Sequence, residues 1–121
     1  MALILIIDDS PTEVHVMKTA LEKHGFETAV AENGAIGIAK ARDLRPDVIL
    51  MDVVMPGVNG FQATRELARS PDTSDIPVII VTTKGLQTDR IWGMRQGAVE
   101  YLVKPVTETK LVDCARAALG H

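Results

Sequence analysis

Short apolar runs that end in polar residues are the feature of this sequence that most limits its fold. Each run is apolar at almost every position, which is typical of a strand buried on both faces of a parallel sheet. The four strongest runs cover residues 2–7, 48–51, 78–81 and 101–103. A less apolar segment, Glu27–Ala31, supplies a fifth strand.

The segments between these runs carry helix start and stop signals. Ser10, Pro11 and Glu13 have the pattern of a capping box with proline at the first helical position. Gly25 is placed to end that helix. Further signals are Asn33-Gly34 and Pro46 for a second helix and Thr107 for the last one. Strands that alternate with helices along one chain predict an α/β protein, a three-layer α/β/α sandwich around an open parallel sheet.

Composition narrows the class of protein further. With 46% apolar and 3% aromatic residues, the chain has enough aliphatic side chains for the core of one domain, residues 1–121. A formal net charge of −3 provides no basic surface for nucleic acid or an anionic membrane. The lone Cys114 cannot form an internal disulfide, no leader pattern opens the chain, and no run is long enough for a membrane span. We therefore expect a soluble cytoplasmic protein.

The residues that directly follow the apolar runs are small and polar, or charged. Ligands of open parallel sheets bind outside the carboxyl ends of the strands, so these residues form the candidate site. They are Asp8-Asp9, Asp52, Thr82-Thr83 and Lys104-Pro105.

Three carboxylates at one edge predict a cation. Two like charges about 4 Å apart repel by roughly 4 kcal/mol at an effective dielectric of 20, and a hard divalent ion such as Mg²⁺ relieves that repulsion. Asp52 stands alone at its strand end and is the natural nucleophile, because carboxylates accept groups covalently. Lys104 offers a point charge to a phosphate, and Thr82 offers a hydroxyl donor. Together they predict an acceptor site for an acyl phosphate.

In this order along the chain, these residues resemble the pattern of response regulator receiver domains. The turn at 55–57 (Met-Pro-Gly) and the Asn59-Gly60 pair add to the resemblance, which covers essentially the whole chain. Residues 81–84 and 89–98 further resemble the stand-alone regulators of type IV pilus twitching motility. The resemblance implies a CheY-like, flavodoxin-like fold with sheet order 2-1-3-4-5 and no effector domain.

The resemblance also implies the ligands of the cation. Asp9 and Asp52 would bind Mg²⁺, or Mn²⁺ in its place, through their side chains. Asp8 would act mainly through a water molecule, and Val54 would contribute its backbone carbonyl.

The residues around the phosphoryl group follow from the same resemblance. Thr82 would bond the phosphoryl group and shift inward when Asp52 is modified, with the backbone of Thr83 beside it. Lys104 would pair with the phosphoryl group, and its bond to Pro105 is expected to be cis. Tyr101 matches an aromatic switch residue that turns inward as Thr82 moves.

The function implied is that of a phosphoacceptor and not of an enzyme, with at most self-phosphorylation and slow self-dephosphorylation. A histidine kinase or its phosphotransfer domain would supply the phosphoryl group to Asp52. A downstream protein would bind the face made by the fourth helix, fifth strand and fifth helix, in twitching motility or chemotaxis-like control. No nucleic acid partner is expected.

One departure from the family pattern bears on the lifetime of the phosphoryl group. Fast family members carry polar or acidic residues two positions after the acceptor and two after the threonine. Here these positions hold Val54 and Lys84. We therefore expect a long-lived phosphoryl state.

Other readings of the sequence stay open at this point. An aspartate-dependent phosphatase of the haloacid dehalogenase type needs a second acid where Val54 stands, and a flavodoxin would need hydroxyls and glycine where Asp8-Asp9 stands. A receiver that no longer takes phosphate is the third alternative. Singly, Thr82 could be a turn residue and Tyr101 a half-buried core residue. Trp92 is expected to pack its helix, although its place in the fourth helix leaves a partner contact open.

Overall fold

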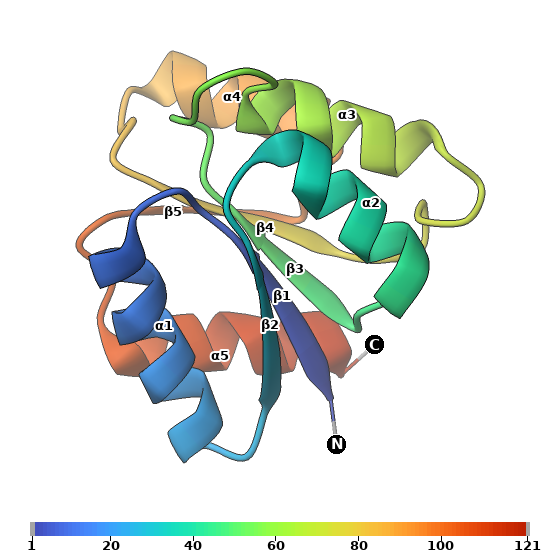
Figure 1. Cartoon of the computed structure of the whole chain (residues 1–121). Helices are drawn as coiled ribbons and strands as arrows, with labels where there is room; N and C mark the ends of the chain where they lie inside the picture. The colour runs from blue at the N-terminus through green and yellow to red at the C-terminus, as the bar shows by residue number, and fades with distance from the viewer. Residues whose placement is uncertain (1, 121) are drawn as a thin grey trace.

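The computed structural model describes residues 2–120 and has the predicted architecture (Figure 1). Five strands alternate with five helices. The strands are β1 (Leu3–Ile7), β2 (Glu27–Ala31), β3 (Val48–Met51), β4 (Val78–Thr82) and β5 (Glu100–Val103). The helices are α1 (Pro11–Lys23), α2 (Gly34–Leu44), α3 (Gly60–Arg69), α4 (Gln87–Arg95) and α5 (Glu108–Leu119). Among residues 2–120, no helix combines the length and apolar character that a membrane crossing needs.

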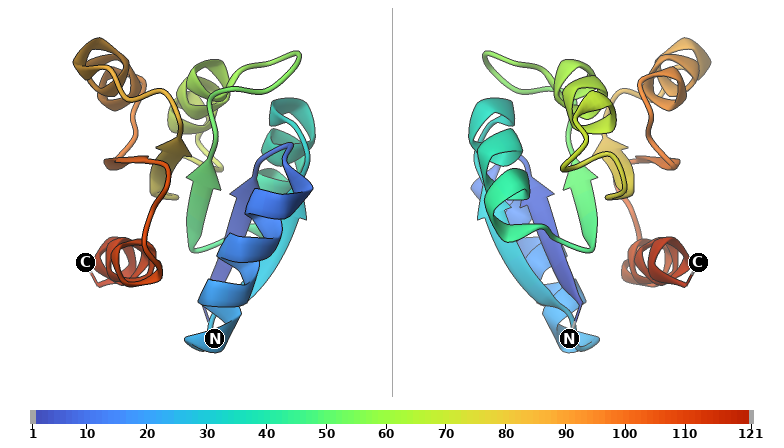
Figure 2. Two further views of the ribbon diagram at one scale, coloured as in Figure 1. Left: turned by 90° about the vertical axis from the view of Figure 1, so that its left-hand side faces the viewer. Right: turned by 90° about the vertical axis from the view of Figure 1, so that its right-hand side faces the viewer.

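The sheet has the predicted strand order. Its five strands lie as β2-β1-β3-β4-β5, and every neighbouring pair is parallel. Figure 2 shows the arrowheads of the strands pointing toward one edge of the sheet. The carboxyl ends of all strands therefore meet at that edge, where a site of this fold is expected.

Helices cover both faces of the sheet (Figure 1). On one face, α1 and α5 pack on β1, β3 and β4 through residues such as Leu21 and Leu111. On the other face, α2 and α3 pack through Ile38 and Leu67. Alternate residues of each strand serve the two faces, which explains why the runs are apolar at every position.

The first helix starts where the sequence predicts, but only half of the expected capping box forms. The Ser10 hydroxyl accepts the backbone N–H of Glu13 at 3.4 Å. The Glu13 carboxylate does not return to the Ser10 N–H, because Asp8 accepts that donor at 2.9 Å. A complete box instead opens α3, where Asn59 and Gln62 bond one another's backbone N–H groups. The carboxylate of Glu13 is thus free for another contact.

The fourth helix is the most loosely packed one. Gly93 is its only buried residue among those described. A side chain at this position would collide with Ile80 and Tyr101, since a Cβ there would lie 2.8 and 2.9 Å from their side-chain carbons. Trp92 is 48% exposed and lines a groove between α3 and α4, so about half of its surface is covered. The small surface that α4 buries is consistent with a helix that can shift.

Candidate functional site

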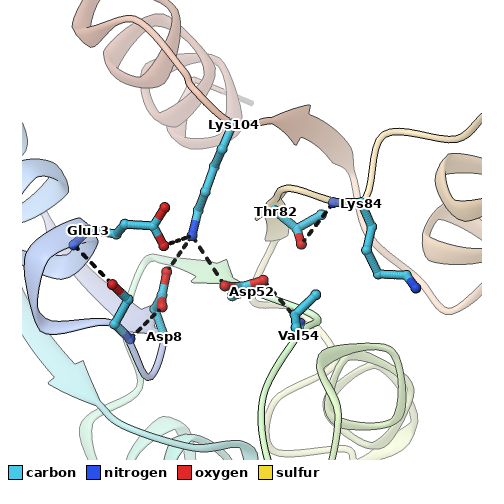
Figure 3. Close-up of polar contacts among 8 residues, drawn as sticks. Asp8, Glu13, Asp52, Val54, Thr82, Lys84 and Lys104 are labelled. Carbon is cyan, nitrogen blue, oxygen red and sulfur yellow. Dashed lines mark hydrogen bonds and ion pairs between the residues drawn. The ribbon is translucent and has the colours of Figure 1, made fainter.

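The carboxyl edge of the sheet brings together side chains from four strands. Asp8 follows β1, Asp52 follows β3, Thr82 ends β4, and Lys104 follows β5. Asp8, Asp52 and Thr82 are buried, although polar side chains are normally found at the surface. Figure 3 shows Asp8 and Asp52 at the end of Lys104, with Thr82 beyond Asp52. The topology therefore collects these predicted site residues at one place.

The ammonium group of Lys104 is the centre of the site. Its Nζ atom donates to Asp8 at 2.8 Å, to Glu13 at 2.6 Å and to Asp52 at 3.2 Å. The Lys104 side chain is only 9% exposed. The peptide bond between Lys104 and Pro105 is cis. A buried cation that bonds three carboxylates holds the negative charge of the site together.

Glu13 is the site residue that sequence reasoning missed. It lies on the first turn of α1 and reaches Lys104 from the side (Figure 3). The sequence pattern assigned its carboxylate to the capping box, a purely local role. Its partner Lys104 is 91 positions away in the chain. The contact becomes evident only in the folded structure, where the start of α1 lies near the end of β5.

The acidic cluster of the site is Asp8, Glu13 and Asp52. One carboxylate oxygen from each lies within 4.8 Å of the other two. Asp9 is exposed and outside this cluster, so its predicted role as a ligand remains a prediction. Oxygen donors of this kind and number suit Mg²⁺ or another hard divalent cation. The residues present therefore fit a metal site.

Burial and hydrogen bonding shift the pKa values of Asp8 and Lys104. Burial raises the pKa of Asp8, against the opposing effect of its hydrogen bonds from Lys104 and Ser10. Burial by itself would lower the pKa of Lys104, but the hydrogen bonds to Asp8 and Glu13 and the charge of Asp52 outweigh it and raise that pKa. Lys104 therefore remains a cation throughout the physiological range.

The Asp52 carboxylate is held from two sides. One oxygen accepts the bond from Lys104, and the other accepts the backbone N–H of Val54 at 3.1 Å. The Val54 side chain is 51% exposed and stands beside the carboxylate (Figure 3). Gly60 lies against the backbone of Asp52 so closely that no side chain would fit there. The Asp52 carboxylate is therefore held in place before any ligand arrives.

Thr82 lies on the far side of Asp52 from Glu13 (Figure 3), and Tyr101 contacts the same loop as Thr82. The Thr82 hydroxyl accepts the backbone N–H of Lys84 at 3.5 Å, and the Tyr101 hydroxyl donates to the Lys84 carbonyl at 2.7 Å. Both side chains are buried, so Tyr101 occupies an inward position here. Thr83, by contrast, is exposed.

Comparison with known proteins assigns this arrangement to a known class. Residues 4–116 match the family model of the response regulator receiver domain. The chain is 59% identical over 120 residues to protein PilH of Pseudomonas aeruginosa and covers 99% of both chains. It is 39% identical to the phosphate regulon regulator PhoB of the same organism, but spans only 51% of that longer protein.

Solved structures agree in fold. The Vibrio cholerae chemotaxis protein CheY4 superposes with a TM-score of 0.92 at 30% identity, with 98% of this chain and 99% of that chain covered. The receiver domain of the sensor histidine kinase PA1611 of Pseudomonas aeruginosa superposes with a TM-score of 0.92 at 29% identity. The coverage is 99% of this chain and 98% of that one, and that structure has a magnesium ion coordinated in its active site cleft.

Proposed function

Because this chain belongs to the response regulator receiver family, and therefore serves as a receiver in a phosphorelay, we propose that it takes the phosphoryl group on Asp52. The observation that supports this assignment is the position of the Asp52 carboxylate. It directly follows β3, is buried and fixed by Val54 and Gly60, and lies 3.2 Å from the ammonium of Lys104.

The transfer would be a displacement at phosphorus. A carboxylate oxygen of Asp52 attacks the phosphorus of a phosphohistidine, the P–N bond breaks, and the leaving imidazole takes up a proton. The product is an acyl phosphate on Asp52. Lys104 would follow the new phosphoryl oxygens, because its bond to the Asp52 carboxylate already points there. The hydroxyl of Thr82 would donate to another phosphoryl oxygen.

A divalent cation would bind beside the phosphoryl group. The proposed ligands are Asp9 and Asp52, with Asp8 behind a water molecule and the backbone carbonyl of Val54. Mg²⁺, or Mn²⁺ in its place, would supply neutralisation of the charge that gathers on the phosphoryl oxygens.

We propose a histidine kinase or its phosphotransfer domain as the phosphoryl donor. A downstream protein would receive the signal at the surface of α4, β5 and α5. The loose attachment of α4, which buries only Gly93 among its described residues, supports that surface as the one that changes. Both partners would be met in the cytoplasm.

The similarity to PilH supports a role in type IV pilus twitching motility or a chemotaxis-like pathway. This role can be tested by complementation of a Pseudomonas aeruginosa strain that lacks PilH. We expect this chain to restore the twitching zone and its Asp52→Ala variant to fail at equal expression. Equal restoration by both would contradict a role for phosphorylation.

Intact-mass measurement tests the proposal that Asp52 accepts the phosphoryl group. The purified chain is incubated with acetyl phosphate and Mg²⁺, and its intact mass is measured. We expect the wild-type chain to gain one phosphoryl group and Asp52→Ala to gain none. Asp43→Ala, a variant at an exposed acid of α2, serves as the matched control and should gain the group. Uptake by Asp52→Ala would overturn the assignment.

A further inference from the structure

Glu13 makes the shortest of the three bonds to Lys104, at 2.6 Å, yet no role in phosphoryl transfer follows for it from the family pattern. We propose that Glu13 competes with the phosphoryl group for Lys104, so that it opposes formation of the phosphorylated state. The proposal rests on the proposed function of Asp52.

The donors of Lys104 leave no room for a further partner. An ammonium group has three N–H donors, and Asp8, Glu13 and Asp52 occupy them. A phosphoryl oxygen on Asp52 would take over the donor that now points at the Asp52 carboxylate, which is the longest of the three bonds at 3.2 Å. It can draw the ammonium closer only if the 2.6 Å bond to Glu13 lengthens or breaks. The competition is therefore built into the geometry of the unmodified site.

Glu13 is the partner that can be released at the lowest cost. The side chain of Asp8 is buried and also bonded to the Ser10 N–H, and Asp52 is the acceptor itself. The Glu13 side chain is 41% exposed, and within residues 2–120 its carboxylate has no hydrogen-bond partner besides Lys104. Water can solvate it as soon as Lys104 leaves.

The released carboxylate also has space to move into. Glu13 and Lys104 line an open groove of about 420 Å³ between α1 and the segment from Lys104 to Leu111. Val16 and Val106 form part of its apolar wall. Glu13 can therefore turn toward solvent without displacing other side chains.

The proposal predicts that removal of the competing carboxylate strengthens binding of a phosphoryl mimic. The probe is beryllofluoride at saturating Mg²⁺, with the bound probe measured by fluorine NMR. We expect Glu13→Gln to bind the probe about threefold to tenfold more tightly than the wild-type chain, which is the usual net worth of one hydrogen bond. Glutamine suits the first turn of a capped helix, so α1 should be preserved.

Two further variants separate competition from a general effect of charge. Glu13→Asp keeps the charge on α1 but withdraws the carboxylate from Lys104, so competition predicts tighter binding than in the wild type. Glu22→Gln removes a charge elsewhere on α1, where Glu22 bonds Lys18, and should bind as the wild type does.

Each outcome has a definite meaning. Tighter binding by both Glu13 variants supports the proposal. Tighter binding by Glu13→Gln alone, with Glu13→Asp equal to the wild type, would overturn it in favour of a field effect. Equal or weaker binding by Glu13→Gln would also overturn it. If the wild-type chain bound no beryllofluoride and gained no phosphoryl mass, the failure would lie with the proposed function of Asp52.

Discussion

The hydroxyl of Tyr101 donates a 2.7 Å hydrogen bond to the backbone carbonyl of Lys84, which ties β5 to the loop that follows β4. The backbone N–H of Lys84 donates to the hydroxyl of Thr82 at 3.5 Å. The backbone of Lys84 thus lies between the two predicted switch residues. A shift of Thr82 toward a phosphoryl oxygen would release one side of this loop while Tyr101 holds the other, a bistable arrangement that a local charge change can bias.

The first prediction concerns this bond. Tyr101→Phe keeps the ring and removes the hydroxyl, so the Lys84 carbonyl loses its buried donor. We expect the free energy of unfolding, measured in urea, to fall by about 1 kcal/mol, the usual worth of one such bond. Phosphoryl uptake by Asp52 should persist, because the hydroxyl does not contact the carboxylate cluster. An unchanged urea midpoint would show that the hydroxyl contributes nothing to the folded state.

The second prediction concerns the titration of the same group. Burial, followed by the negative charges of Asp89 and Asp52, raises the pKa of Tyr101 to about 12 from its ordinary value of 10.0. Since the folded state holds this proton more tightly than the unfolded one, the stabilisation is complete below pH 10 and is lost as the pH rises toward 12. Tyr101 is the only tyrosine, so ultraviolet absorbance of tyrosinate reads it directly.

The control for this titration is the unfolded chain. In denaturant the same residue should titrate near pH 10, as an exposed tyrosine does. Gly93→Ala provides a second comparison, since its methyl group would press on the Tyr101 ring and should move the pKa back toward the ordinary value. A folded wild-type chain whose tyrosine titrates near 10 would contradict the buried position of the ring.

The third prediction concerns the counter-ion of the cluster. Lys104→Ala leaves Asp8 and Asp52 buried without a cation, so the metal-free variant should unfold about 3 kcal/mol more easily than the wild type in urea. The same loss should tighten Mg²⁺ binding by about tenfold, because no ammonium remains to repel the metal ion. Calorimetric titration with Mg²⁺ measures that affinity.

Lys110→Ala, at an exposed position on α5, is the matched control and should alter neither quantity. Mg²⁺ should restore much of the stability of Lys104→Ala, since it replaces the missing charge. We also expect Lys104→Ala to lose the coupling of phosphorylation to Tyr101. Weaker Mg²⁺ binding in this variant would mean that Lys104 positions the ligands instead of opposing the cation.

Much of the fold could be predicted because its strands carry a local signal. The predicted strands Glu27–Ala31 and Val48–Met51 coincide with β2 and β3. Two strand limits differ from the prediction: Thr82 ends β4 and Glu100 begins β5. Both residues are polar, so a search for apolar runs leaves them out. The start of α3 could also have been predicted from the sequence, because Asn59 and Gln62 have the spacing of a capping box.

The site was less predictable where contacts cross the chain. Strand ends led to Asp8, Asp52, Thr82 and Lys104, because topology alone places them together. Glu13 had a plausible local role in a capping box, and its real partner is remote in sequence. A pattern of neighbouring residues cannot decide between those two roles. The role of Glu13 depends on whether Asp8 or Glu13 accepts the Ser10 N–H, and in the structure Asp8 does.

The exposure of Trp92 could not be predicted for a different reason. A helix face is assigned from the periodicity of its buried residues. Within α4 only Gly93 is buried, and a glycine adds nothing to a hydrophobic pattern. The position of Trp92 therefore depends on the close approach that Gly93 allows.

The last prediction concerns the lifetime of the phosphoryl group. In hydrolysis a water molecule attacks the phosphorus and the bond between phosphorus and the Asp52 oxygen breaks. Inorganic phosphate then leaves the site. Val54 stands beside the Asp52 carboxylate with its side chain 51% exposed, and it offers that water no hydrogen bond. We therefore expect the wild-type acyl phosphate to be long-lived and to decay over minutes or longer, because a bond that would position this water is missing.

Val54→Asn would supply such a bond and should speed the decay about fivefold. The time course of intact mass after removal of acetyl phosphate measures both rates. Val99→Asn is the matched control, because Val99 is equally exposed at 51% but precedes β5 at the opposite end of the strand from the site. Its decay should equal that of the wild type. Decay of the wild-type chain within seconds would refute the argument, because an apolar residue at position 54 would then be no barrier to the attacking water.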